Sequence, residues 1–158
     1  MCSNKAKGII MDGIEFKQAK AEDADIIYRL CIENVDKYED TASFDDYDKV
    51  KDWIKRKINK FIDEYVRIYK DGEVCGYYRV CKDKDEYELD DFYLLEGYRG
   101  QGIGTYVMKH ILENNGGDFF LYVFKRNDAA LRLYQKFGFT VREDLGTRYI
   151  MERKNGIS

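Results

Sequence analysis

The chain of 158 residues contains no proline, and it has only one histidine and one tryptophan. Without proline, the ends of helices and strands have to be predicted from glycine, from Asp and Asn, and from the spacing of apolar residues. The single histidine is His110, and the four cysteines, Cys2, Cys31, Cys75 and Cys81, follow no CxxC or Cys/His spacing. We therefore expect neither a structural zinc site nor any other metal.

Scattered thiols are typical of a reducing cytoplasm, where we expect this chain to act. Buried free thiols are favoured for Cys75 and Cys81, with a cross-strand pairing of the two as the alternative. No apolar run reaches the roughly 18 residues of a membrane span, and no secretory signal pattern opens the chain. The formal net charge of -3 argues against a protein devoted to nucleic acid. We expect no membrane and no nucleic acid among its partners.

Hydrophobic residues make up 44% of the chain and aromatic residues 15%, which is typical of a sequence with a packed core. The length suits one domain with one core. We predict a loose N-terminus over residues 1–12, a single domain over 13–153 and a C-terminal tail over 154–158.

Apolar spacing predicts the order of elements along the chain. A short strand at 14–19 precedes a helix within 20–38, and an acidic loop at 39–48 leads to a second helix. The second helix carries an apolar stripe that runs from Val50 through Trp53 to Tyr65. Three strands follow within 66–95, turned at Asp71-Gly72 and at Lys82 to Asp85, and then come a helix, a strand at 118–124, a helix at 127–138 and a hairpin at 139–154. This order predicts an α/β protein of the α+β type, in which a mixed, mostly antiparallel, twisted sheet of about seven strands carries helices on both faces.

Three glycines lie within five residues where the third strand of this meander meets a helix, in the run Arg99-Gly100-Gln101-Gly102-Ile103-Gly104. A P-loop needs a lysine directly after its last glycine, and Thr105 stands there instead. A dinucleotide site needs G-x-G-x-x-G in a βαβ unit, which neither the spacing nor the preceding meander supports. The pattern R/Q-x-x-G-x-G/A fits, with successive amides at a helix N-terminus converging on a pyrophosphate. A glycine-rich turn without a ligand is the alternative.

A second motif follows at residues 127–139, where NDAALRLYQKFGF has the form N-x-x-A-x-x-L-Y-x-K-x-G-F. The two motifs, in this order, resemble the GNAT superfamily of acetyl-CoA-dependent N-acetyltransferases. Within that superfamily, ELDDFYLLEGYRGQGIG is most similar to the polyamine and diamine acetyltransferases. The resemblance implies the GNAT fold, acetyl-CoA as cosubstrate, and direct transfer of the acetyl group to a primary amine through a tetrahedral intermediate.

The resemblance also implies which residues bind the cosubstrate. The glycine loop is expected to hold the pyrophosphate, and the strand before it, splayed at a bulge, to pair with pantetheine through its backbone. Asn127 matches an asparagine that caps the next helix and contacts the cofactor, although the cap alone explains an Asn there. The expected cofactor-binding residues are Phe92, Tyr93, Leu94, Arg99, Gly100, Gln101, Gly102, Ile103, Gly104, Thr105, Asn127 and Tyr134.

For catalysis, Tyr134 matches the tyrosine that protonates the departing thiolate, the alternative being a core tyrosine. Asp90 takes the position of the family's carboxylate base and Asp91 that of its neighbour, with Glu88 as a further candidate, and the base acts directly or through a bridging water. Strand alternation puts Asp90 and Asp91 on opposite faces unless a bulge intervenes. Solvated carboxylates at a strand edge are the alternative for both.

The acceptor is expected to be a small, cationic amine, because residues 36–48 carry six acidic residues against one lysine. Such a wall attracts a polyamine, an aminoglycoside, a lysine or a protein N-terminus, although a solvated acidic loop explains the charges equally well. A non-catalytic acyl-CoA-binding sensor or scaffold is the alternative function. The final hairpin offers a strand edge through which the chain could form a homodimer.

Overall fold

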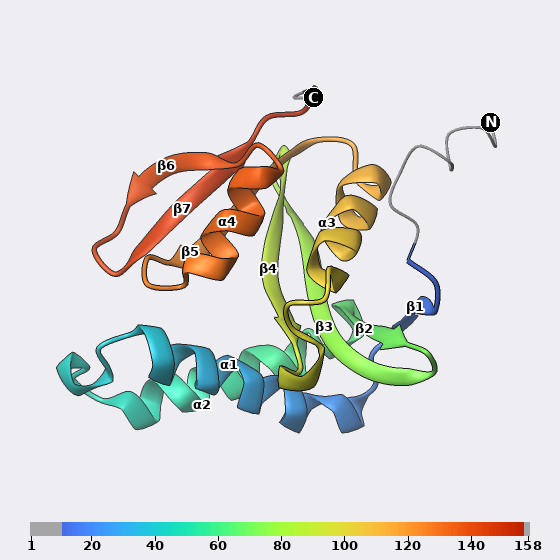
Figure 1. The fold of residues 1–158 in the computed structure, drawn as a ribbon. Helices are drawn as coiled ribbons and strands as arrows, with labels where there is room; N and C mark the ends of the chain where they lie inside the picture. Colours follow the sequence, from blue (N-terminus) through green and yellow to red (C-terminus); the bar gives the residue numbers. More distant parts are fainter. Residues whose placement is uncertain (1–10, 157–158) are drawn as a thin grey trace.

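The computed structural model describes residues 11–156, which form a seven-stranded sheet and four α-helices (Figure 1). The strands are β1 (Ile14–Gln18), β2 (Tyr65–Lys70), β3 (Glu73–Asp83), β4 (Glu86–Leu94), β5 (Asp118–Phe124), β6 (Thr140–Asp144) and β7 (Arg148–Arg153). The helices are α1 (Ala24–Tyr38), α2 (Tyr47–Lys60), α3 (Ile103–Asn114) and α4 (Asp128–Lys136). The predicted types and order of the elements, and the predicted fold class, are confirmed.

The strands lie in the order β1-β2-β3-β4-β5-β7-β6, and every neighbouring pair is antiparallel except β4 and β5. One hydrophobic cluster joins the sheet to α3 and α4, and a second joins it to α1 and α2. Figure 1 shows α1 and α2 along one side of the sheet, with α3 and α4 packed on the other. The predicted hairpin turn is also present, since Asp71 and Gly72 both have positive φ angles of 52° and 85°.

The sheet opens between β4 and β5. Only three residue pairs join these strands, from Glu86↔Asp118 to Glu88↔Phe120, and the later part of β4 has no partner on that side within residues 11–156. Close by, Arg79 of β3 faces Asp91 while Val80 faces Leu89, so Asp90 is the extra residue of a β-bulge. The predicted splay and bulge therefore both lie next to the glycine loop.

Three predictions about packing need correction. Trp53 was placed on the apolar stripe of the second helix, but its side chain is 59% exposed, while Ile54 and Ile58 face the core. Tyr65 does not extend that helix: it begins β2 and is fully buried. Cys75 and Cys81 are both free thiols, as favoured, and both lie on β3, which excludes the alternative pairing across strands; however, only Cys75 is buried, and Cys81 is half-buried.

Most of the predicted loose terminus, residues 1–10, lies outside the described residues, but Met11 packs against the core. In the predicted tail, the Asn155 amide donates a hydrogen bond to Asp118 (2.7 Å). None of the helices within residues 11–156 has the length and apolar character needed to cross a membrane.

Candidate active site

The glycine loop adopts a conformation that depends on glycine. Gly100 and Gly102 have φ angles of 74° and 86°, which side-chain-bearing residues rarely adopt. Gly102 is the N-cap of α3 and contributes no side chain, so nothing of its own covers the first-turn amides of that helix. A Cβ on Gly104 would lie 3.5 Å from Leu133 Cδ2, which shows how closely α3 approaches α4. The loop thus presents the positive end of a helix dipole at an open cradle.

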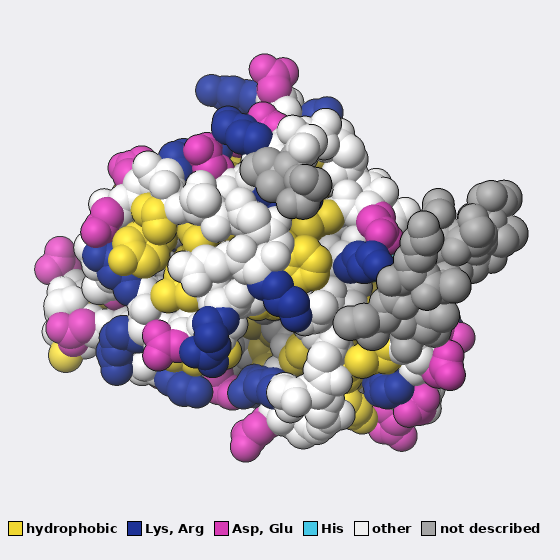
Figure 2. Space-filling model, turned by 45° about the horizontal axis from the view of Figure 1, so that its top comes forward, with side chains coloured by type: hydrophobic (Ala, Val, Ile, Leu, Met, Phe, Trp, Pro, Cys, Tyr) yellow, Lys and Arg dark blue, Asp and Glu magenta, His cyan; other side chains and the backbone are white. Residues whose placement is uncertain are grey.

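A cavity of about 1060 Å³ lies beside this loop, at the upper end of the size range of small-molecule sites. Strand β4, the glycine loop, α4 and the C-terminal half of α1 form its walls, and Figure 2 shows a hollow with apolar side chains inside and Lys and Arg side chains around it. Its lining residues include the basic side chains Lys37, Arg99, Arg132 and Lys136.

Ten of the twelve predicted cofactor-binding residues line this one cavity. The Gln101 side chain instead turns back to donate a hydrogen bond to the Gly97 carbonyl (2.8 Å). Ile103 is 1% exposed and packs in the core beneath the loop. The lining residues among those predicted are Phe92, Tyr93, Leu94, Arg99, Gly100, Gly102, Gly104, Thr105, Asn127 and Tyr134.

Helix α4 contributes two of these residues. The Asn127 side chain accepts a hydrogen bond from the Ala130 amide (3.2 Å), so it caps the helix and also lines the cavity. Tyr134 is 8% exposed, with its ring 5.8 Å from that of Phe139. Burial raises the pKa of Tyr134 above its usual value, so the phenol keeps its proton. A cavity wall therefore carries a buried proton donor.

The bulge at Asp90 brings both aspartates within reach of one lysine. Lys57 Nζ, from α2, lies 2.6 Å from Asp90 Oδ2 and 3.5 Å from Asp91 Oδ2. The bulge thus interrupts the alternation that would separate the two side chains. Asp90 also accepts a hydrogen bond from Arg79 Nη1 (2.7 Å), so two cations hold its carboxylate. The Asp90 carboxylate is therefore engaged in direct ion pairs with two side chains.

Asp91 has a different environment: it is 8% exposed, and its carboxylate accepts hydrogen bonds from two tyrosine hydroxyls. Tyr65 donates to its Oδ2, and the Tyr93 hydroxyl donates to its Oδ1 at 2.8 Å. Burial, followed by the charge of Asp90, raises the pKa of Asp91 above the ordinary aspartate value, and Lys57 opposes that rise. A carboxylate with a raised pKa suits the role of a general base.

Glu88, the third candidate, lies two residues before Asp90 on β4. Burial and the charge of Asp90 raise its pKa, and its Oε1 lies 3.9 Å from the Cys81 sulfur. Neither Glu88 nor the two aspartates line the cavity directly. The carboxylates therefore form a group behind the wall that β4 provides.

Acidic residues line one side of the cavity, but most of them are not those predicted from the sequence. Within the acidic stretch 36–48, the one acidic residue that lines the cavity is Asp36, joined by Glu33 from α1 and by Glu96 after β4. Phe44 instead packs on the Tyr47 ring, 5.4 Å away. The wall therefore comes mainly from the end of helix α1.

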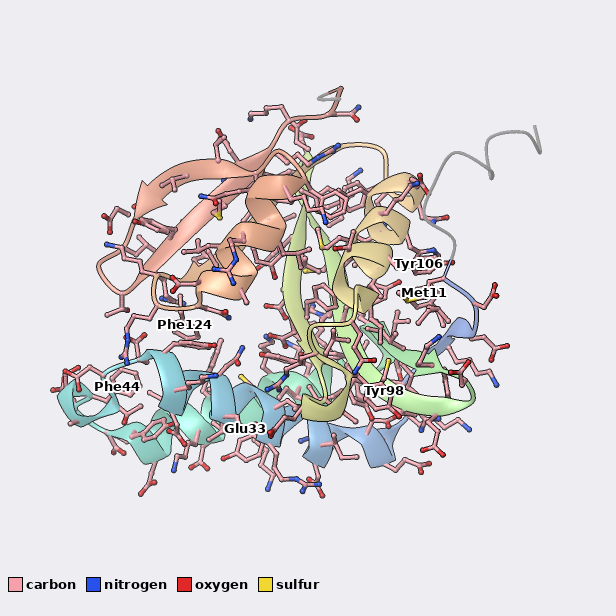
Figure 3. The ribbon with its side chains drawn as sticks, in the orientation of Figure 1. Met11, Glu33, Phe44, Tyr98, Tyr106 and Phe124 are labelled. Carbon is pink, nitrogen blue, oxygen red and sulfur yellow. The ribbon has the colours of Figure 1, made fainter. Side chains whose placement is uncertain are left out.

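The same end of α1 reaches β5 across the opening in the sheet. The rings of Tyr38 and Phe124 lie 6.0 Å apart, and Figure 3 labels Glu33 on α1 and Phe124 at the end of β5. Tyr38 also lines the cavity. This aromatic contact closes one side of the space beside the acidic wall.

Sequence reasoning missed Lys57, Arg79 and the side chain of Tyr93 as parts of this site. For Lys57 a signal existed: it falls three residues after Ile54, on the core side of α2 rather than on the lysine-rich outer face. No such signal marked Arg79, because its contact with Asp90 depends on the register between β3 and β4. Among residues 11–156, no group of three or more His, Cys, Asp or Glu side chains could hold a metal ion.

Comparison with known proteins gives a consistent result. The model of the acetyltransferase (GNAT) family matches residues 27–139. Spermine/spermidine N(1)-acetyltransferase from Bacillus subtilis is 30% identical over 93 residues, covering 51% of this chain and 61% of that protein. Mycothiol acetyltransferase from Corynebacterium efficiens is 35% identical over 83 residues, covering 48% of this chain and 27% of that protein. The chain thus matches less than two thirds of the length of either relative.

Solved structures agree with the chain in fold. PaiA N-acetyltransferase from Thermoplasma acidophilum, in complex with coenzyme A, has a TM-score of 0.66 and 22% identity, covering 89% of this chain and 98% of that chain. An N-acetyltransferase from Staphylococcus aureus has a TM-score of 0.67 and 21% identity, covering 87% of this chain and 98% of that one. At such identities the likeness establishes the fold alone.

Proposed function

The chain belongs to the acetyltransferase (GNAT) family, and we propose that it moves the acetyl group of acetyl-CoA to the primary amine of a small, cationic acceptor. One observation carries this proposal. The glycine loop, the open edge of β4, the buried phenol of Tyr134 and an acidic wall all border the same cavity. Binding groups for an anionic cosubstrate and for a cationic acceptor therefore meet beside a proton donor.

The residues of the cavity fit coenzyme A. Gly102 leaves space where a side chain would stand, and the first-turn amides of α3 suit a pyrophosphate. Arg99, Arg132 and Lys136 line the cavity and supply positive charge for phosphate groups. Beyond Glu88, β4 has no partner on its β5 side, so its backbone is available to an extended amide-bearing chain such as pantetheine. When bound, acetyl-CoA supplies an activated acyl carbon.

Two protein groups are assigned to proton transfer. Tyr134 protonates the leaving sulfur, because its phenol is protonated at neutral pH and lines the cavity. Asp91 takes the proton of the acceptor, in preference to Asp90, whose oxygen is held by Lys57 and Arg79. This order reverses the one expected from the sequence, which placed Asp90 first.

The negative charge on one side of the cavity supports a cationic acceptor. Glu33, Asp36 and Glu96 border the cavity on the side of α1, where they attract an ammonium group. The relative from Bacillus subtilis is named for spermine and spermidine, which are cationic amines. A polyamine is thus the first acceptor to test, ahead of a lysine or a protein N-terminus.

Thermal unfolding with and without acetyl-CoA tests the binding half of this proposal. A ligand that binds only the native state stabilises it by about 2.7 kcal/mol at a hundredfold excess over Kd. We expect a clear rise in Tm at saturating acetyl-CoA, whereas an unchanged Tm would contradict the proposal. Release of free thiol after adding an amine then separates an enzyme from a non-catalytic sensor, which binds acetyl-CoA without turnover.

A further inference from the structure

The proposed base is not in contact with the space that the acceptor enters. Asp91 is 8% exposed and does not line the cavity, whereas the next three residues of β4 do: Phe92, Tyr93 and Leu94. A proton leaving an amine in the cavity therefore needs a carrier to reach the Asp91 carboxylate.

One of the hydrogen-bond partners of Asp91 also lines the cavity. Its Oδ2 accepts from Tyr65 and lies near Lys57, and neither of these residues lines the cavity. Its Oδ1 accepts from the Tyr93 hydroxyl at 2.8 Å. Among residues 11–156, Tyr93 is the one residue that both lines the cavity and hydrogen-bonds Asp91.

We propose that Tyr93 is a catalytic residue whose hydroxyl relays the acceptor's proton from the cavity to Asp91. This inference rests on the proposed acetyl transfer. An N–H bond of the bound ammonium breaks as an O–H bond forms on Tyr93, and the original Tyr93 proton moves to Asp91 Oδ1. An ammonium and a carboxylate thereby become a neutral amine and a carboxylic acid, and the proton later returns to solvent. The freed lone pair can then form the C–N bond.

The electrostatics suit a concerted relay. Burial and the charge of Asp91 raise the pKa of Tyr93 well above the usual tyrosine value, so Tyr93 does not lose its proton alone. Burial also raises the pKa of Asp91 towards that of an amine, which makes the transfer less uphill. Since the two opposite charges disappear together, the low-polarity surroundings favour the transfer.

The groups that set the proton affinity of Asp91 come from each element packed around it. The charge of Lys57 and the hydrogen bonds from Tyr65 and Tyr93 favour the ionised carboxylate, while burial and the charge of Asp90 disfavour it. Charged and titratable groups that interact with Asp91 are Cys31 from α1, Lys57 from α2, Tyr65 from β2, Asp90 and Tyr93 from β4, and Tyr134 from α4, and Arg79 from β3 pairs with the adjacent Asp90.

The test compares wild type with Tyr93→Phe, which removes the hydroxyl and keeps the ring. The acceptor probes are spermidine, kanamycin, lysine and a peptide with a free N-terminus, and the fastest of the four is used throughout. Values of kcat/KM are measured from about pH 6 to about pH 10, where the amine loses its proton in solution. Tyr87→Phe, on the same strand but stacked on Phe119 away from the cavity, is the matched control.

We expect Tyr93→Phe to lose about 10²-fold in kcat/KM near pH 7. The loss should shrink steadily towards pH 10, because a neutral amine no longer needs the relay. Acetyl-CoA affinity and the Tyr87→Phe rates should stay at wild-type values. A loss that is constant across pH, or no loss, would overturn the relay while leaving the proposed function intact. If wild type acetylates none of the four amines, the proposed function fails and the relay with it.

A double variant tests whether Tyr93 and Asp91 act in the same step. If Tyr93 and Asp91 act as one unit, Tyr93→Phe combined with Asp91→Asn should be no slower than the slower single variant. Losses that multiply would show two independent roles and would overturn the relay.

Discussion

The ammonium group of Lys57, on α2, lies 2.6 Å from the carboxylate of Asp90, on β4. The same ammonium lies 3.5 Å from Asp91, so one helix residue sets the charge balance of both carboxylates. Under the proposed function, Asp91 is the carboxylate that accepts the proton of the acceptor. This assignment therefore supports several predictions about activity.

Replacing Lys57 with Met should move the acid limb of the pH–rate profile to higher pH. The Lys57 cation lowers the pKa of Asp91 against the effect of burial. Without it the pKa of Asp91 rises, so the carboxylate becomes protonated, and inactive as a base, at a higher pH. Lys57→Arg keeps the charge and is the control. An acid limb in Lys57→Met that stays at its wild-type position would show that Asp91 is not the base.

Asp91→Asn should reduce kcat by about 10²-fold, and Asp90→Asn should reduce it less. Asp90 is committed to Lys57 and Arg79, whereas Asp91 connects to the cavity through Tyr93. Steady-state kinetics on the two variants decides between them, with thermal melts to confirm folding. A larger loss in Asp90→Asn would restore Asp90 as the base.

Tyr134→Phe should lower kcat by about 10²-fold and leave acetyl-CoA affinity unchanged. The phenol keeps its proton because burial raises its pKa, and its removal takes away the proton for the leaving sulfur. Titration of acetyl-CoA alongside turnover separates the two effects. An equal loss of binding and turnover would mean that Tyr134 serves packing against Phe139.

Gly102→Val should abolish acetyl-CoA binding, and it should also destabilise the fold by about 1–3 kcal/mol through its positive φ. Gly146→Val is the matched control, since Gly146 has a φ of 97° and open space around it in the β6–β7 turn. Calorimetric titration of both variants isolates the effect of the side chain at the loop. Retained binding in Gly102→Val would refute the assignment of the loop to the pyrophosphate.

Local patterns predicted the parts of the site that depend on neighbouring residues. Glycine at Gly102 is required by a positive φ, and Asn127 by the cap of α4, so both are evident within a few residues of sequence. The hairpin turn at Asp71-Gly72 follows from the same local chemistry. These features depend on interactions between residues that are close together in the sequence.

The features of the site that the sequence did not predict depend on contacts between residues far apart in the chain. The family resemblance implied a bulge in this strand, but its position at Asp90 follows from the register shift after Arg79, which strand alternation alone does not indicate. Lys57 and Asp91 are 34 residues apart, and only the packing of α2 on the sheet brings them together. Tyr65 followed the helical spacing of α2 but belongs to β2, because its ring fills the core between helix and sheet. The identity of the base depends on all three.

Transfer of the acetyl group is the central claim, and mass spectrometry of the acceptor tests it most directly. The protein is incubated with acetyl-CoA carrying a deuterated acetyl group and with spermidine, kanamycin, lysine or a peptide with a free N-terminus. We predict a deuterated N-acetyl product on at least one of these amines, formed at a rate that falls in Asp91→Asn. Binding of acetyl-CoA without any acetylated amine would contradict the account and would assign the cavity to a non-catalytic sensor.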